Sequence, residues 1–193
     1  MSPKTKEQYE EIRQKSAEAI LQAALELFGH QGYHSTTISQ IAKAAGVSKG
    51  LMYNYFPSKE ALLDEIIHGV MAVGEGLMTL LEGPSSPGER LRKLLLNNIE
   101  MLKSNLHFWK LITSLSFQPE VVERYSDLIR TKARANLEVV EELFRQKGSP
   151  DPRREALMLS ATLDGIFLHY LNLREDYPLE EMVNHLIEQF CSE

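Results

Sequence analysis

Apolar residues recur along most of the chain with spacings of three and four, the period at which side chains line one face of an α-helix. The strongest interruptions are short clusters of Gly, Pro and Ser, and the sequence shows no convincing alternation of a β-strand. The sequence therefore predicts an all-α protein. We expect about nine helices, at residues 7–29, 37–45, 48–56, 58–81, 89–104, 106–117, 119–147, 152–174 and 179–191.

Short polar residues mark the starts of several of these helices. Thr37, Ser48, Ser58 and Asp151 each precede a helical pattern, and their side-chain oxygens can accept hydrogen bonds from N–H groups of the first turn. Gly46 follows the second helix, where glycine suits a left-handed cap. These helix ends are therefore predicted from local chemistry.

Composition indicates a globular chain. Its 193 residues are 43% apolar and 25% charged, enough for a sizeable core in one domain or one domain plus a small second unit. No stretch reaches the ~18 uninterrupted apolar residues of a membrane span, and the N-terminus lacks the apolar centre of a signal peptide. The single cysteine, Cys191, cannot form an internal disulfide, which fits a reducing compartment. We expect a soluble cytoplasmic protein with no membrane partner.

Charge is distributed unevenly. The net charge of −6 taken alone argues against a nucleic-acid partner. However, residues 1–59 contain seven Lys or Arg and five Asp or Glu, a net of +2, so residues 60–193 carry −8. A nucleic-acid contact is therefore expected in the first part of the chain.

Residues 37–56 have the spacing of a helix-turn-helix, because two short helical runs are joined by Gly46 and Val47. Met52 and Phe56 lie four residues apart and can face the first of these helices. Lys49, Gly50, Tyr53 and Asn54 then occupy the remaining surface of the second helix.

This exposed set suits DNA, since Tyr can bond a phosphate oxygen, Lys supplies charge and Asn can bond an adenine edge. Gly50 lets the backbone approach the duplex closely. Short helix pairs joined by a glycine are also common in helical bundles, so the spacing by itself leaves a purely structural interpretation open.

A dense set of residues around this segment forms the pattern of a known family. Its members are Phe28, Gly32, Tyr33, Thr36, Thr37, Ile41, Ala42, Ala45, Gly46, Val47, Ser48, Gly50, Tyr53, Tyr55, Phe56, Lys59 and Leu62. The pattern resembles the N-terminal domain of the TetR/AcrR family of bacterial transcriptional regulators, over roughly residues 10–65 and without a gap. The resemblance implies a three-helix DNA-binding head, at residues 1–57, and a larger helical body for ligand binding and dimerisation, at residues 58–193.

The resemblance also assigns residues to DNA contacts. It places Lys49, Gly50 and Tyr53 in the groove. It implies phosphate contacts for Thr37, Tyr55 and Lys59. The positions that vary within the family, and that help to set the operator sequence, are Ser39, Leu51 and Asn54.

Residues 90–190 contain helices that are apolar over more of their circumference than a surface helix needs. Their aromatic residues can line a cavity, although an aromatic stripe at helical spacing is more often plain core. The resemblance favours a cavity for a small, mainly apolar or aromatic effector. The candidate lining residues are Met101, Phe108, Trp109, Ile112, Phe117, Phe144 and Phe167. The polar residues that can mark the site are Asn97, Asn98, His107, Asp164 and His169, although each also has a structural explanation.

The last two helices are the expected dimer interface. The resemblance places the Asp164–Gly165 step there, and Gly165 permits a close helix approach. Two copies can then form a four-helix bundle across a two-fold axis. The candidate interface residues are Leu157, Ala161, Asp164, Gly165, Leu168, Leu171, Met182, Leu186 and Phe190.

These observations favour a homodimeric repressor that binds a near-palindromic operator in double-stranded DNA and is released by a small effector. An activator, or a regulator without small-molecule control, would show the same sequence features. An enzyme that uses the helical body is the least favoured class, since the sequence shows no nucleophile–base pair, no Gly-rich phosphate loop and no metal-spaced histidines. We expect no cofactor and no metal.

Overall fold

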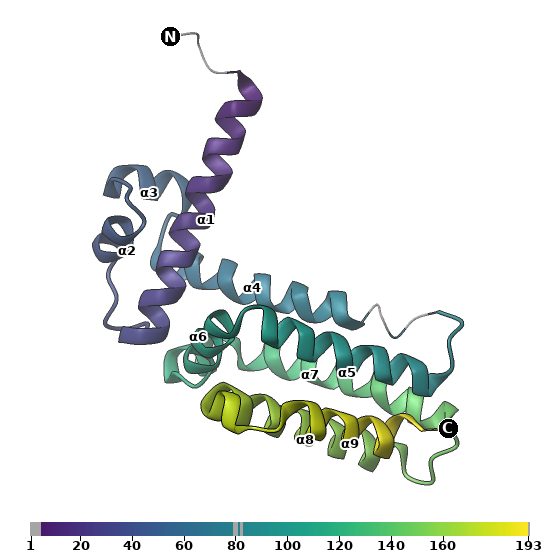
Figure 1. The fold of residues 1–193 in the computed structure, drawn as a ribbon. Helices are drawn as coiled ribbons and strands as arrows, with labels where there is room; N and C mark the ends of the chain where they lie inside the picture. The colour runs from purple at the N-terminus through teal and green to yellow at the C-terminus, as the bar shows by residue number, and fades with distance from the viewer. Residues whose placement is uncertain (1–4, 79–80, 82, 193) are drawn as a thin grey trace. The chain divides into compact units, whose positions relative to one another are not determined.

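The computed structural model describes residues 5–78, 81 and 83–192. The prediction of an all-α fold is confirmed, because the described residues form helices and no strand (Figure 1). The elements are α1 (Lys6–Gln31), α2 (Ile38–Ala44), α3 (Lys49–Tyr55), α4 (Lys59–Met78), α5 (Pro87–Ser104), α6 (Leu106–Ser116), α7 (Pro119–Gln146), α8 (Pro152–Leu173), the 3-10 helix η2 (Arg174–Asp176) and α9 (Leu179–Cys191).

The predicted caps are present. The side chains of Thr37, Ser48, Ser58 and Asp151 each accept a hydrogen bond from the backbone N–H three residues later. Gly46 has a φ of +69°, in the left-handed region that favours glycine. These ends were predictable because a cap is formed by neighbours in the sequence.

Two local features differ from the prediction. Helix α5 begins at Pro87, two residues earlier than expected, because Ser86 and Glu89 form a capping box with each other's backbone N–H groups. The 3-10 helix η2 follows α8 directly, at the point where we expected α8 to end. Both differences lie at helix ends, where a single extra hydrogen bond decides the boundary.

The chain divides into two compact units. The first contains residues up to 71 together with 110–124, and the second contains 72–109 and the residues from 125 onward. Helices α4, α6 and α7 each contribute residues to both units. The first unit is therefore larger than the DNA-binding head of residues 1–57 that the sequence predicts.

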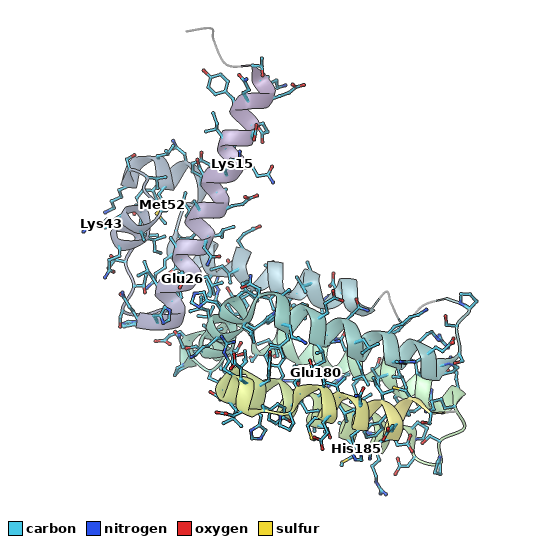
Figure 2. All side chains as sticks on the ribbon, viewed as in Figure 1. Lys15, Glu26, Lys43, Met52, Glu180 and His185 are labelled. Atoms are coloured by element: carbon cyan, nitrogen blue, oxygen red, sulfur yellow. The ribbon has the colours of Figure 1, made fainter. Side chains whose placement is uncertain are left out.

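The core of the first unit fixes α2 and α3 against α1 and α4. Phe28, Ile41, Met52 and Leu62 come from these four helices and are all fully buried. Figure 2 shows Met52 on the inner side of α3, whereas Lys43 lies at the outer edge of α2. Only Ile41 and Ala42 of α2 and Met52 of α3 are buried, so the opposite faces of both short helices remain in solvent.

Residues 110–124 close the end of α1. A methyl group at Gly29 would lie 2.5 Å from Leu111 Cδ2 and 3.2 Å from Leu111 Cα, so only glycine fits this contact. Gln118 donates a hydrogen bond from Nε2 to the Phe28 carbonyl (2.8 Å) and accepts one at Oε1 from the Tyr33 N–H (2.6 Å). This segment therefore completes the first unit although it lies about 80 residues further along the chain.

The second unit is built from α5, α7, α8 and α9, and α9 packs against both α5 and α8 (Figure 1). Its core consists mainly of Leu residues with two aromatic rings, Phe144 and Phe190, whose centroids are 6.0 Å apart. Such a core stabilises the unit by removing apolar area from water.

Helix α8 carries an unusually apolar surface. Residues Pro152–Asp176 are the one stretch among the described residues that is long and apolar enough to cross a membrane, with a mean hydropathy of 1.2, and a single such helix is weak evidence for a span. Only 22% of its most apolar 18-residue segment is buried within the chain. A contiguous apolar face of this kind indicates an interaction surface.

Candidate nucleic-acid interface and ligand cavity

Helices α2 and α3 form the expected helix-turn-helix. Each has seven residues, and the turn between them is closed by a hydrogen bond from the Val47 N–H to the Ala42 carbonyl (3.0 Å). Gly46 reverses the chain in this turn, and the side chain of Ser48 starts α3. The two helices are thus held rigidly enough for α3 to present a fixed outer face.

The outer face of α3 carries the side chains that the sequence assigned to the groove. Lys49, Gly50, Tyr53 and Asn54 are exposed, and the Tyr53 side chain is 46% accessible to solvent. Leu51 also lies on the surface, while Tyr55 is half-buried at the end of the helix. Among the described residues Lys49 has no hydrogen-bond or ion-pair partner, so its charge is available to an anion.

Lys59, for which the resemblance implies a phosphate contact, makes several contacts within the chain. Its ammonium donates to the carbonyls of Tyr33 (2.9 Å), His34 (3.2 Å) and Thr36 (3.1 Å), and it lies 4.4 Å from the centroid of the Tyr33 ring. Because an ammonium has three hydrogens, these carbonyls use all its donors. Lys59 therefore ties the loop before α2 to the start of α4.

The same loop is held by Tyr33 and Glu60. The Tyr33 hydroxyl donates to Glu60 Oε1 over 3.2 Å. Desolvation, together with the negative charge of Glu60 and this hydrogen bond, raises the pKa of Tyr33 to about 12. Hydrogen bonds from its own backbone N–H, from Ser58 and from Tyr33 hold the pKa of Glu60 below its usual value. The network keeps Tyr33 protonated and Glu60 ionised near neutral pH.

Thr37 and Ser39, the two residues predicted to contact DNA from the first helix of the motif, differ in whether their hydroxyls are already used. The Thr37 hydroxyl accepts a hydrogen bond from the Gln40 backbone N–H and donates one to Gln40 Oε1 over 2.8 Å. Ser39 is exposed. The structure adds Lys43, which sequence reasoning missed, because Lys43 is exposed one turn after Ser39 and has no partner among the described residues. Its i+4 spacing from Ser39 was the signal that could have identified it.

Four of the predicted effector residues lie together in the second unit. The Trp109 ring is 5.1 Å from Phe108 and 5.8 Å from Phe167, both edge to face, and its indole N–H donates to the Met101 carbonyl over 3.1 Å. These residues are half-buried and contact one another. They form an aromatic cluster and are not among the residues that line the cavity described below.

The other three predicted effector residues are placed elsewhere. Phe117 is 76% exposed. Ile112 is buried in the first unit, and Phe144 is fully buried in the core of the second. Helical spacing showed that these residues were apolar, but it did not show which neighbour each would meet.

A cavity of about 400 Å³ lies instead between α5, α7 and α8. Its size is in the range of small-molecule sites. Its walls are mainly Leu, with a few polar side chains. The lining residues are Leu94, Leu95, Asn98, Ala133, Asn136, Leu137, Val140, Leu157, Leu159, Ser160, Leu163 and Asp164.

Asp164 is the charged group of this cavity. Its side chain reaches solvent, but desolvation by its surroundings raises the pKa of the carboxyl above its usual value. No described residue forms a hydrogen bond or an ion pair with it. Of the five polar residues that the sequence singled out, Asn98 and Asp164 line this cavity, and Asn97, His107 and His169 do not.

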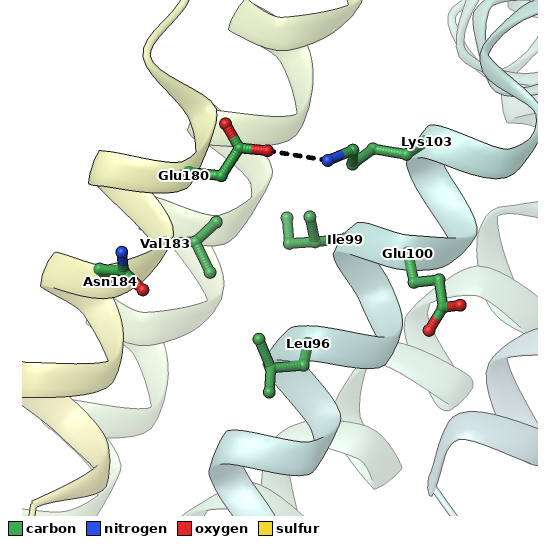
Figure 3. Close-up of a pocket in the computed structure, with 7 residues that line it drawn as sticks. All are labelled: Leu96, Ile99, Glu100, Lys103, Glu180, Val183 and Asn184. Carbon is green, nitrogen blue, oxygen red and sulfur yellow. Dashed lines mark hydrogen bonds and ion pairs between the residues drawn. The ribbon is translucent and has the colours of Figure 1, made fainter.

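A second hollow, a groove of about 350 Å³, lies between α5 and α9 (Figure 3). Leu96, Ile99 and Val183 form its apolar part. Lys103 and Glu180 face each other across one end at 2.8 Å, and this ion pair raises the pKa of Lys103 and lowers that of Glu180. Because these two charges satisfy each other, the groove has less to offer a charged ligand than the cavity beside Asp164.

The predicted dimer residues divide into two groups. Leu157, Ala161, Asp164 and Leu168 are exposed along one face of α8, with Gly165 beside them and half-buried. In contrast, Leu171, Leu186 and Phe190 are buried in the second unit, and Met182 is half-buried against its core. Leu186 and Phe190 belong to the core of the second unit because α9 turns its apolar stripe inward, whereas Leu171 is buried on α8.

Comparison with known proteins agrees with this geometry. Residues 20–66, which include α2 and α3, match the family model for bacterial regulatory proteins of the tetR family. The chain is 31% identical to the HTH-type transcriptional regulator BetI of Serratia proteamaculans over 159 residues, 77% of each protein. The chain belongs to the TetR family of bacterial transcriptional regulators.

The resemblance stated from the sequence is therefore confirmed, and this TetR-family protein is a transcriptional regulator with a DNA-binding helix-turn-helix. The uncharacterized regulator YuxN of Bacillus subtilis is 57% identical over 44 residues, which cover 23% of this chain and 15% of YuxN. The crystal structure of NalD, the secondary repressor of the MexAB-OprM multidrug efflux pump in Pseudomonas aeruginosa, superposes with a TM-score of 0.73 at 27% identity and covers 95% of this chain and 99% of NalD. The fold similarity thus extends well beyond the helix-turn-helix.

Proposed function

We propose that this TetR-family protein is a cytoplasmic homodimeric repressor that binds a near-palindromic operator and is released by a small molecule in the cavity between α5, α7 and α8. The observation that carries the proposal is the outer face of α3, where Lys49 and Tyr53 are exposed and have no partner within residues 5–78, 81 and 83–192, while Met52 is buried on the inner face. The similarity to NalD, which is described as a repressor, supports repression rather than activation of transcription.

In this proposal α3 enters the major groove. Lys49 and Tyr53 contact phosphate or base edges, Asn54 bonds an adenine edge, and Gly50 allows the close approach. Ser39, Leu51 and Tyr55 lie at the edges of this surface. Lys43 on α2 replaces Lys59 as the second cation, because the Lys59 ammonium is occupied by three carbonyls.

Two copies associate through the exposed face of α8. Leu157, Ala161 and Leu168 present apolar area there, and no Cβ added at Gly165 would meet a described atom within 4 Å. A second α8 can therefore approach closely at that point. Dimerisation also supplies affinity that the head lacks alone, since its net charge is only slightly positive.

Release follows from helices that have residues in both units. Helix α4 continues from Asp64 in the first unit to glycines in the second, and Arg124 at the start of α7 forms a two-pronged ion pair with Asp64. Further along, α7 contributes Leu137 and Val140 to the cavity. A ligand that prefers one arrangement of α4 and α7 weakens DNA binding by the factor by which DNA weakens ligand binding. An operator affinity that stays unchanged with the cavity saturated would contradict this mechanism.

The test of the DNA surface starts from selection of a preferred duplex out of a random-sequence pool, followed by fluorescence anisotropy on that duplex. Tyr53→Ala should weaken binding by roughly tenfold or more, because each of two heads loses a contact. Phe117→Ala is the matched control, an exposed aromatic residue of the same unit outside α2 and α3. Equal affinities for the two variants, or no selected sequence, would refute the proposed interface.

A further inference from the structure

The cavity between α5, α7 and α8 is lined by four polar side chains, those of Asn98, Asn136, Ser160 and Asp164. The Ser160 hydroxyl donates its only hydrogen to the Ala156 carbonyl (2.9 Å), and Asn98 Nδ2 donates to the Leu94 carbonyl (2.8 Å). Both bonds lie within a helix, to the carbonyl four residues earlier. The Ser160 oxygen and Asn98 Oδ1 are therefore left as acceptors toward the cavity's contents.

Asp164 adds a negative charge to these acceptors. It lies four residues after Ser160, so the two share a face of α8. Among the lining residues that the structure describes, Asp164 is the only one with an ionisable side chain. No cation contributes to the shift of its pKa, which is due to desolvation alone.

Apart from Asn98, Asn136, Ser160 and Asp164, the wall is apolar. Leu94 and Leu95 come from α5, Leu137 and Val140 from α7, and Leu163 from α8. A neutral apolar molecule would desolvate the carboxylate further without pairing it, which is costly. An anionic molecule would meet a like charge. A molecule with hydrogen-bond donors and a positive charge at one end, and an apolar body behind, satisfies both parts of the wall.

We propose that the cavity binds an amine with an apolar body, whose ammonium group donates to Asp164 and to the free acceptors of Ser160 and Asn98. This inference rests on the assignment of the cavity as the effector site and narrows the effector to a cationic class. An ammonium group here would give the Asp164 carboxylate a partner of opposite charge, which it lacks among the described residues.

The test compares three probes that share one skeleton and differ in the charge of the end group: 4-phenylbutylamine, 4-phenylbutanol and 4-phenylbutyrate. Binding to the full-length protein is measured by isothermal titration calorimetry at pH 7. The amine should bind at least roughly tenfold more tightly than the alcohol, since a hydrogen bond to a charged group contributes more than a neutral one. The carboxylate should bind most weakly.

Variants of the lining residues test whether Asp164 and Ser160 cause the preference for the amine. Asp164→Asn keeps the volume and removes the charge, so it should lower the affinity for the amine by roughly tenfold or more while leaving the alcohol unchanged. Ser160→Ala should lower the amine affinity by a few-fold. Glu138→Gln is the matched control, because Glu138 is an exposed carboxylate of α7 that does not line the cavity, and it should leave all three affinities unchanged.

The outcomes separate the inference from the wider proposal. An alcohol that binds as tightly as the amine, an Asp164→Asn variant that keeps full amine affinity, or no binding by any probe would each overturn the cationic assignment. Operator binding by the unliganded protein and its mass by light scattering are measured on the same samples. If the wild-type protein neither binds the operator nor has the mass of a dimer, the proposal of a homodimeric DNA-binding repressor is overturned instead.

Discussion

Helices α3 and α8 both leave large side chains in solvent, but the charges beside them differ. On α3, Tyr53 is accompanied by Lys49, a cation without a partner among the described residues. On α8, Leu157 and Leu168 are each 47% exposed and flank Asp164, an anion likewise without a described partner. An aromatic surface with free cations suits a polyanion, whereas an apolar face with one carboxylate suits a second copy of itself and a cationic ligand.

The contrast also shows why exposure alone does not reveal function. Phe117 is 76% exposed, more than Tyr53, Leu157 or Leu168, yet it lies outside α2, α3 and α8. Lys59 carries the same charge as Lys49, yet its ammonium is used by three carbonyls. An unpaired charge next to exposed apolar area is the more specific sign of a binding surface.

The largest expected effect is on DNA binding. Lys49→Glu places a negative charge against the phosphates in each of two heads, so the affinity for the selected operator should fall by roughly a hundredfold or more. Fluorescence anisotropy at fixed salt measures it. Lys110→Glu makes the same change at an exposed lysine of the first unit and should have little effect. If the two variants lose equal affinity, a diffuse field rather than α3 is responsible.

The next effect concerns association. Leu168→Asp adds a second carboxylate to the exposed face of α8 near Asp164, and it should raise the dissociation constant of the dimer at least roughly tenfold. Analytical ultracentrifugation over a dilution series measures it. Leu173→Asp is the control, because Leu173 is equally exposed but lies on a different face of α8. A dimer that tolerates Leu168→Asp must use another surface.

A smaller effect distinguishes the two lysines of the first unit. Lys59→Met removes the donor from three carbonyls, so it should lower the free energy of unfolding by about 1–2 kcal/mol. Lys49→Met should leave the free energy of unfolding nearly unchanged but weaken DNA binding. Urea denaturation and anisotropy on both variants give the four values. Equal stability losses would mean that Lys59 contributes no more than a surface lysine.

The smallest expected effect is a pH dependence. The pKa of Tyr33 is about 12 in the folded chain and near 10 when unfolded, so the unfolded state loses the proton first as pH rises. The stability contributed by Tyr33 is complete below pH 10 and is lost between about pH 10 and 12. Urea denaturation across this range should show a shallower decline for Tyr33→Phe than for the wild type. Parallel declines would place Tyr33 outside the network with Glu60.

The sequence predicted the helices and α3 well because their determinants are local. Thr37 and Ser48 bond to residues three positions away, and Gly46 needs only its own φ. Burial of Met52 with exposure of Tyr53 follows from adjacent positions on a helix with a period of 3.6 residues. No knowledge of the rest of the chain was needed for these predictions.

The cavity and the role of Lys59 were not predictable in the same way. The cavity wall combines three helices, so it depends on how α5, α7 and α8 pack rather than on any one pattern. The Lys59 ammonium meets carbonyls 23 to 26 residues earlier in the chain. Likewise, Leu186 and Phe190 form an apolar stripe, but the stripe does not say whether it faces its own core or a partner.

The contact between Gly29 and Leu111 has a practical consequence for protein engineering. A fragment cut after residue 71 would lack Leu111 and also Gln118, which bonds the Phe28 carbonyl and the Tyr33 N–H. A chimeric regulator that joins this DNA-binding head to the ligand-binding body of another protein therefore needs residues 110–124 together with the head. A fusion joined at residue 57 or 71 would leave the end of α1 uncovered, whatever operator it carries.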